Sequence, residues 1–76
     1  MAKVDSEQFV NLFASLFQDS VQVSIDTRFR ELEEWSSMQA LIVIAAIDEN
    51  YGVTIPEKEF RAASTVEELY QLVANA

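Results

Sequence analysis

Apolar residues recur every three or four positions in three stretches of the chain, and this spacing predicts three main helices. The first stretch covers residues 6–18 and places Phe9, Val10, Leu12, Phe13, Leu16 and Phe17 on one face. Asp5 is its predicted N-cap, with Gln8 three positions later completing a capping arrangement. Glu7 suits the positive end of the helix dipole. These features predict an amphipathic helix that buries one face.

The most apolar stretch predicts a second helix over residues 37–51. Ser36 is its predicted N-cap, and Gln39 completes a Ser-x-x-Gln capping box. Gly52 follows Tyr51 directly and predicts the end of the helix, because glycine adopts the left-handed conformation without steric cost. Apolar residues lie nearly all round this helix. It is therefore either the central helix of its bundle or a helix that shows an apolar surface to a partner.

The last helix is predicted to begin at Thr65, which forms another capping box with Glu68. Its inward stripe consists of Val66, Leu69, Tyr70 and Val73. Before it, Pro56 predicts the first residue of a short helical turn that runs through Glu59 or Phe60. The pattern as a whole predicts an all-α protein, a small four-helix bundle with three main helices, one short helix and a long first loop.

That first loop, residues 19–35, separates the first two main helices. Its apolar anchors are Val21, Val23, Ile25, Phe29 and Leu32. Three of them alternate with polar residues as in a strand, but nothing else in the chain could pair with such a strand. We therefore expect an extended loop with Phe29 and Leu32 in the core and a single turn begun by Asp26 or Thr27. A connection of this length is uncommon in a compact domain and is often functional.

Composition narrows the class of protein further. The 76 residues, half of them apolar, suffice for one hydrophobic core, so we expect a single domain over residues 1–76. The net charge of −8, with five Lys and Arg, argues against nucleic acid and anionic membranes as partners. No apolar stretch is long enough for membrane insertion, and the N-terminus lacks the apolar region of a signal peptide. We expect a cytoplasmic monomer.

Catalytic and metal-binding chemistry has few candidates in this chain. There is no Cys and no His, which excludes thiol nucleophiles, Cys/His zinc sites and His acid–base catalysis. The Asp and Glu residues fall on predicted exposed faces, and no window has the ligand spacing of a calcium loop. We therefore predict no catalytic residue and no metal site, and expect that the protein is not an enzyme.

Two adjacent serines open the second main helix. With Ser36 as the N-cap, Ser37 takes the first helical position and its hydroxyl faces outward. The N–H groups and the positive dipole end of a helix favour an anion such as phosphate. On spacing alone, the alternative is that the two serines compete to cap one helix.

Four features occur together and in order. Ser36-Ser37-Met38 opens the apolar helix, and Ile55-Pro56 begins eighteen residues after Ser37. Upstream lies Phe29-x-x-Leu32, and downstream the sequence STVEEL at residues 64–69. In these features the chain from Asp26 to Val73 resembles the acyl carrier protein family, the phosphopantetheine-binding four-helix domains. That family has Asp-Ser-Leu in place of the Ser-Ser-Met tripeptide.

The resemblance implies that a phosphopantetheinyl transferase attaches 4′-phosphopantetheine to Ser37. It implies that acyl groups are bound to this arm as thioesters and are carried from acyl-loading enzymes to acyl-processing enzymes. The pathway would be fatty-acid-like or specialised, such as polyketide, aminoacyl or another acyl transfer. The absence of cysteine permits this role, because the arm would bring the only thiol. The alternative is a small acidic helical adaptor that binds a protein partner through the apolar second helix.

By the same resemblance, partner enzymes are expected to dock around the second helix. The candidate docking residues are Trp35, Ser36, Met38, Gln39, Leu41, Ile42, Ala45, Asp48 and Glu49. Because acids are scarce on the expected exposed side of this helix, apolar contacts should contribute more to the binding of partner enzymes than in carriers with an acidic helix. Trp35 is expected either to pack in the bundle or to touch the arm or a partner. Ala45 and Ala46 either leave room for an acyl chain inside the bundle or allow close helix packing.

Overall fold

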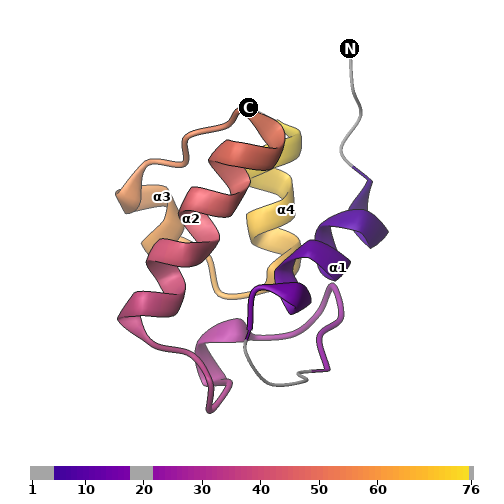
Figure 1. The fold of residues 1–76 in the computed structure, drawn as a ribbon, viewed down its shortest axis with the longest axis vertical. Helices are drawn as coiled ribbons and strands as arrows, with labels where there is room; N and C mark the ends of the chain where they lie inside the picture. The colour runs from indigo at the N-terminus through magenta and orange to yellow at the C-terminus, as the bar shows by residue number, and fades with distance from the viewer. Residues whose placement is uncertain (1–4, 18–21, 76) are drawn as a thin grey trace.

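The computed structural model describes residues 5–17 and 22–75, and its regular elements are helices (Figure 1). They are α1 (Ser6–Ser15), the 3-10 helix η1 (Phe29–Glu31), α2 (Ser37–Tyr51), α3 (Glu57–Ala62) and α4 (Val66–Ala74). Within these two segments no strand forms. The prediction of an all-α bundle with three main helices, one short helix and a long first loop is therefore confirmed.

The core lies where α1, α2 and α4 face one another, and the first loop closes one end of it (Figure 1). The largest fully buried side chains are Phe9, Phe13, Phe29, Val43, Ile47, Val66 and Leu69. Each such side chain stabilises the folded state by about 1.5–3 kcal/mol relative to exposure. These seven residues come from every main helix and from η1, so the core ties the first loop to the bundle.

Side-chain caps begin α1 and α2 at the predicted residues. The Asp5 carboxylate accepts a hydrogen bond from the Glu7 amide at 2.9 Å, and the Ser36 hydroxyl accepts one from the Gln39 amide at 3.2 Å. Within the described residues, neither Gln8 nor Gln39 bonds back to its cap. The N-caps are therefore confirmed, whereas the capping arrangement with Gln8 and the capping box with Gln39 are wrong.

The helix α1 ends at Ser15, although its apolar pattern continues to Phe17 and the predicted helix continued to Gln18, which lies outside the described residues. Leu16 is the C-cap, and Phe17 follows in a non-helical bend, yet the Phe17 side chain is buried. The apolar pattern continues past the last helical turn because these side chains reach the core from an irregular backbone. Periodicity alone therefore predicted a helix that is too long.

The described part of the first loop is extended and anchored, as predicted. Phe29 is fully buried in η1, which begins two residues after the predicted Thr27, whereas Leu32 is half-buried and packs against the core. Val21 lies outside the described residues. The loop also bonds to α4: the Val66 amide donates to the Thr27 carbonyl at 3.0 Å, and the Glu67 amide donates to Ile25 at 2.8 Å. These bonds satisfy the N–H groups that the first turn of a helix leaves unpaired.

The start of α4 is confirmed in full. The Thr65 hydroxyl accepts a hydrogen bond from the Glu68 amide at 3.2 Å, and the Glu68 carboxylate accepts one from the Thr65 amide at 3.0 Å. That carboxylate also accepts from the Ser64 amide at 2.6 Å. Together with the loop carbonyls, this box leaves the first turn of α4 well satisfied and explains why the helix begins where the sequence predicts.

The short helix α3 differs from its prediction at both ends. Pro56 is its N-cap rather than its first helical residue, and the helix continues to Ala62, beyond Glu59 and Phe60. An arginine of the first loop, Arg30, explains the extra length because its guanidinium donates to carbonyls at the end of α3. The sequence pattern contains no local signal for this long-range cap.

Candidate functional site

The two serines at the start of α2 have different environments. Ser36 is extended (φ −152°, ψ 171°), and its hydroxyl is engaged as the N-cap. Ser37 is the first residue of α2, is exposed, and its hydroxyl makes no hydrogen bond to any described residue. The backbone N–H groups of Ser37 and Met38 likewise have no acceptor in the described segments. The arrangement therefore presents one available hydroxyl beside two available N–H donors.

A groove of about 410 Å³ lies beside Ser37, between α2 and α3. Ala40, Leu41 and Ile44 line it from α2, Phe60 lines it from α3, and Trp35 lines it from the end of the loop. Its charged residues are Arg30, Arg61 and Glu57, and Glu57 pairs with Arg61 at 3.4 Å. The groove therefore combines an apolar wall with two guanidinium groups and one carboxylate beside an available hydroxyl, and its guanidinium groups could bind an anionic group.

Trp35 packs into the bundle, one of the two roles expected for it. Its ring centroid lies 4.7 Å from that of Phe29, and its ring stacks on those of Phe13 and Phe60, both at 6.2 Å. Such ring pairs add about 0.5–1.5 kcal/mol each beyond their burial. Because Trp35 also lines the groove, the ring links the core to the surroundings of Ser37.

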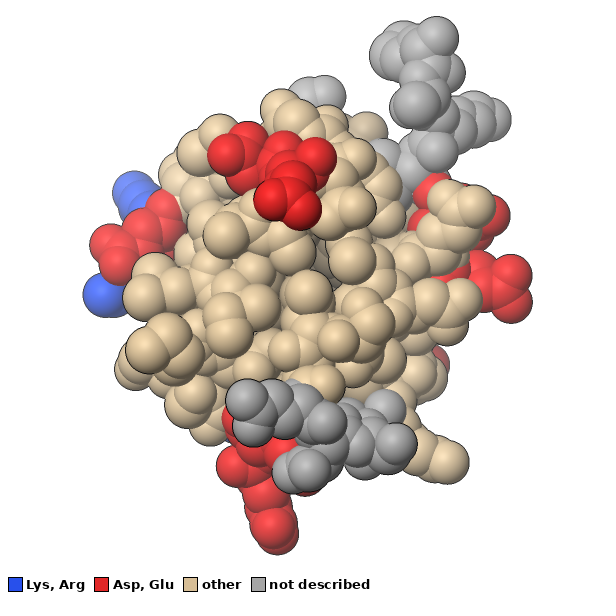
Figure 2. Space-filling model, viewed as in Figure 1, with Lys and Arg blue, Asp and Glu red and all other residues tan. Residues whose placement is uncertain are grey.

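Most candidate docking residues of α2 lie on its outer surface. The exposed fractions of the side chains are 66% for Met38, 64% for Leu41 and 39% for Ile42. Ala45, Asp48 and Glu49 are also exposed, the last two near the end of the helix. Figure 2 shows this side of the molecule, in which the middle of the view carries no charged side chain and acids lie toward the edges. Met38, Leu41 and Ile42 are referred to below as the apolar face of α2.

Gln39 is an exception among the docking candidates, because it is buried and only 8% exposed. Its side-chain amide donates to the Leu16 carbonyl at 3.1 Å and so caps the end of α1. A carbonyl at a helix end needs a donor when it is withdrawn from water. The prediction that Gln39 lies on the outer side of α2 is therefore wrong, and its role in the structure is to join α1 and α2.

Both alternatives for Ala45, room for an acyl chain inside the bundle and close helix packing, place this residue in the interior, and both are wrong for it. Ala45 is exposed, so it cannot line an interior space, and Ala46 is only half-buried. The interior at this level is filled by Val43 and Ile47, which are both almost completely buried. Ala45 therefore belongs to the outer surface of α2 and not to the core.

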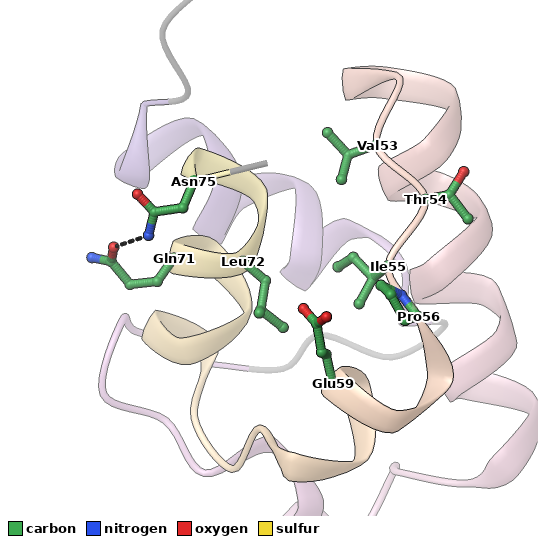
Figure 3. Close-up of a pocket in the computed structure, with 8 residues that line it drawn as sticks. All are labelled: Val53, Thr54, Ile55, Pro56, Glu59, Gln71, Leu72 and Asn75. Atoms are coloured by element: carbon green, nitrogen blue, oxygen red, sulfur yellow. Dashed lines mark hydrogen bonds between the residues drawn. The ribbon is translucent and has the colours of Figure 1, made fainter.

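A second hollow, of about 230 Å³, lies between the loop after α2 and the helix α4 (Figure 3). It shares no residue with the groove beside Ser37. The Glu59 carboxylate points toward Leu72 in this view, and the Asn75 amide donates to Gln71 at 3.3 Å. Its lining has one carboxylate and no cation, and its Thr54 hydroxyl donates to the Asp48 carboxylate at 3.5 Å. The groove beside Ser37, which has an available hydroxyl and two cations, therefore remains the candidate site.

Among the residues that the structure describes, no group of three or more Asp or Glu residues could hold a metal ion. None of the described helices is both long enough and apolar enough to span a membrane.

Comparison with known proteins gives the family of the chain as a whole. The family model described as a phosphopantetheine attachment site matches residues 7–73, which includes both serines and the whole groove. Proteins of that family carry 4′-phosphopantetheine covalently on a serine. No curated protein matched the chain. Arg30 and Arg61 were not predicted as site residues, since only their unusual charge in an acidic chain could have drawn attention to them.

Proposed function

The chain belongs to the phosphopantetheine attachment family, with 4′-phosphopantetheine as its covalent cofactor, and we propose that Ser37 is the serine that carries it. One observation carries this assignment. The Ser36 hydroxyl is engaged as the cap of α2, whereas the Ser37 hydroxyl is exposed and makes no hydrogen bond to a described residue. Of the two serines, only Ser37 can be modified without loss of the cap.

The surroundings of Ser37 favour a phosphodiester at that position. The N–H groups of Ser37 and Met38 and the positive end of the α2 dipole stabilise negative charge there. Arg30 and Arg61 add two guanidinium groups along the groove. Glu57 also lines the groove and pairs with Arg61 at 3.4 Å, so its charged groups are two cations and one carboxylate. This local excess of positive charge offsets part of the repulsion that a phosphate would meet from a chain of net charge −8.

We propose that the protein acts as a carrier and leaves catalysis to its partners. When attached, the arm supplies the thiol on which acyl groups are held as thioesters. The chain itself holds the arm at Ser37 and presents it to a phosphopantetheinyl transferase and then to acyl-loading and acyl-processing enzymes. Tethering raises the concentration of the cargo at each docked enzyme. We further propose that the chain works as one carrier domain, since its buried side chains form one cluster.

Partner enzymes would dock on the apolar face of α2. No charged residue occurs between Ser37 and Ile47, and Asp48 and Glu49 lie beyond them. Apolar contact would therefore supply more of the affinity than charge attraction does. This face, together with Ser36 in place of the family's aspartate, favours a specialised acyl-transfer pathway over general fatty-acid synthesis.

The exposed apolar face of α2 also supports a second candidate, an adaptor that binds a protein without being modified. Met38 and Leu41 are each about two-thirds exposed, with fractions of 66% and 64%, which is unusual for side chains of this kind on a helix of an isolated domain. An adaptor would use this face in the same way but would make no use of Ser37. Modification of Ser37 therefore separates the two candidates.

The test is to incubate the chain with coenzyme A, Mg²⁺ and a broad-specificity phosphopantetheinyl transferase and to measure the intact mass. We expect the mass to rise by one phosphopantetheinyl group in the wild type and in Ser36→Ala, and to stay unchanged in Ser37→Ala. Circular dichroism of each variant establishes that it is folded. An unchanged mass for the wild type would contradict the carrier and favour the adaptor. A gain in Ser37→Ala that is lost in Ser36→Ala would assign the other serine.

A further inference from the structure

Arg30 reaches from the first loop to the end of α3. Its Nε donates to the Ala63 carbonyl at 2.9 Å, and its Nη2 donates to the Phe60 carbonyl at 2.7 Å. The guanidinium carbon lies 5.2 Å from the ring centroid of Phe29 and 5.6 Å from that of Phe60. Two hydrogen bonds and two ring contacts thus fix the orientation of this side chain.

The short helix α3 depends on such support from outside. It has six residues and no side-chain N-cap, and a helix of this length is not stable alone in water. The backbone bonds at its two ends, from Phe60 to Pro56 and from Ala63 to Phe60, are local. The ion pair of Arg61 with Glu57, at 3.4 Å, is exposed and contributes little. Arg30 supplies long-range bonds, placed where a cation also favours the negative end of the helix.

The position of α3 determines the shape of the groove beside Ser37. The α3 side of this groove is formed by Glu57, Phe60 and Arg61, and Ser37 lies on the α2 side. Arg30 lines the groove as well as bonding to α3. A displacement of α3 would therefore alter the surface that an enzyme meets when it approaches the Ser37 hydroxyl.

We propose that Arg30 is a positioning residue for the modification of Ser37, because it holds α3 where a phosphopantetheinyl transferase contacts α3 and Ser37 together. This inference rests on the proposed function. Lysine is a poor substitute at this position, because one ammonium group cannot reproduce the planar fork that meets two carbonyls and lies against two rings. The chain also offers a matched control in Arg28. This arginine lies two residues earlier, is exposed, and pairs at 3.7 Å with Glu31.

The first measurement is hydrogen exchange of the unmodified chain in Arg30→Gln, Arg30→Lys and Arg28→Gln. In Arg30→Gln we expect the amides of residues 57–63 to exchange about tenfold faster than in the wild type, because α3 opens more often. The exchange rates of these amides in Arg30→Lys should lie between those of the wild type and Arg30→Gln. In Arg28→Gln they should match the wild type. This readout does not depend on modification of the chain.

The second measurement is steady-state kinetics of the transferase with each variant as substrate. For Arg30→Gln we expect KM to rise about fivefold with kcat nearly unchanged, since the docking surface changes and the reacting hydroxyl does not. Arg30→Lys, which keeps the positive charge, replaces Arg30→Gln in both measurements if the latter does not fold. Equal KM values for the Arg30 and Arg28 variants would overturn the inference, even if exchange over residues 57–63 were faster. Failure of the wild type to be modified would contradict the proposed function as well.

Discussion

Neighbouring serines in the same tripeptide have separable roles, and stability measurements can distinguish them. Ser36→Ala removes the hydroxyl that accepts from the Gln39 amide, so we expect the free energy of unfolding to fall by about 1 kcal/mol. Ser36→Asp should restore it, since aspartate is as good an N-cap. Ser37→Ala is the matched control and should change stability by less than about 0.5 kcal/mol. Urea unfolding measures all three, and equal losses for the two alanine variants would contradict the division of roles.

Trp35 makes ring contacts with four phenylalanines, so we expect it to contribute strongly to the free energy of unfolding. We expect Trp35→Ala to lower the free energy of unfolding by about 3 kcal/mol, because four phenylalanine rings lose a partner. Trp35→Phe retains part of the packing and should cost less. Urea unfolding again provides the measurement. A loss below about 1 kcal/mol for the alanine variant would show that Trp35 is not part of the core.

Site residues could be predicted from the sequence where their roles depend on residues close to them in the chain. The roles of Ser36 and Ser37 follow from their positions at the start of one helix, so the nearby pattern suffices. Gln39 and Arg30 are different, because their partners lie 23 residues away for Gln39 and 30 and 33 residues away for Arg30. The side chain of Gln39 had an equally good local partner in the cap of its own helix. Its actual acceptor becomes apparent only when α1 is packed against α2.

At the scale of the element, the end of α2 depends on one backbone conformation. Gly52 has φ +68°, and a Cβ built there meets no atom within 4 Å. The cost of Gly52→Ala is therefore backbone strain alone, and we expect a loss of about 1 kcal/mol in the free energy of unfolding. Gly52→Asn should cost less, since asparagine tolerates this region better. If thermal or urea unfolding of Gly52→Ala matched the wild type, the left-handed conformation of this residue would be in doubt.

The start of α4 gives a dependence of stability on pH. The backbone amides of Ser64 and Thr65 donate to the Glu68 carboxylate and lower its pKa below the ordinary value of 4.5. A carboxyl group with a lowered pKa in the folded state stabilises that state above its unfolded pKa. The stabilisation is lost as the pH falls from about 4.5 through the lowered value.

Glu68→Gln removes this titration, so its melting temperature should fall less than that of the wild type between pH 6 and pH 3. Glu67→Gln is the matched control, because Glu67 is exposed and no hydrogen bond within the described residues reaches its carboxylate. The comparison requires thermal unfolding at several pH values. Parallel curves for Glu68→Gln and the wild type would contradict the role of Glu68.

Helix starts were predicted more accurately than helix ends. Asp5, Ser36 and Thr65 are N-caps in the structure because short side chains satisfy amides two or three residues away, a local interaction. The end of α1 and the full length of α3 depend instead on donors from Gln39 and Arg30. The sequence does not contain these partners near the ends that they cap.

At the scale of the whole molecule, the apolar face of α2 should affect docking without affecting stability. Leu41 is 64% exposed, so Leu41→Ser should change the free energy of unfolding by less than about 0.5 kcal/mol. We expect it to raise the KM of partner enzymes several-fold, with weak dependence on salt, because apolar contacts are not screened. Gln71→Ser, on the exposed side of α4, is the control. Equal KM values for the two variants would contradict docking on this face.

The position of Trp35 also allows its fluorescence to report on the surroundings of Ser37. It is the only tryptophan in a chain without cysteine, and its ring lies along the groove beside Ser37. Its emission therefore arises from a single place, without overlap from another indole. Once an arm is attached, its thiol would be the one group that a maleimide dye labels. Energy transfer from Trp35 to that dye would then report, in real time, how far the arm swings from the body of the protein when an enzyme binds.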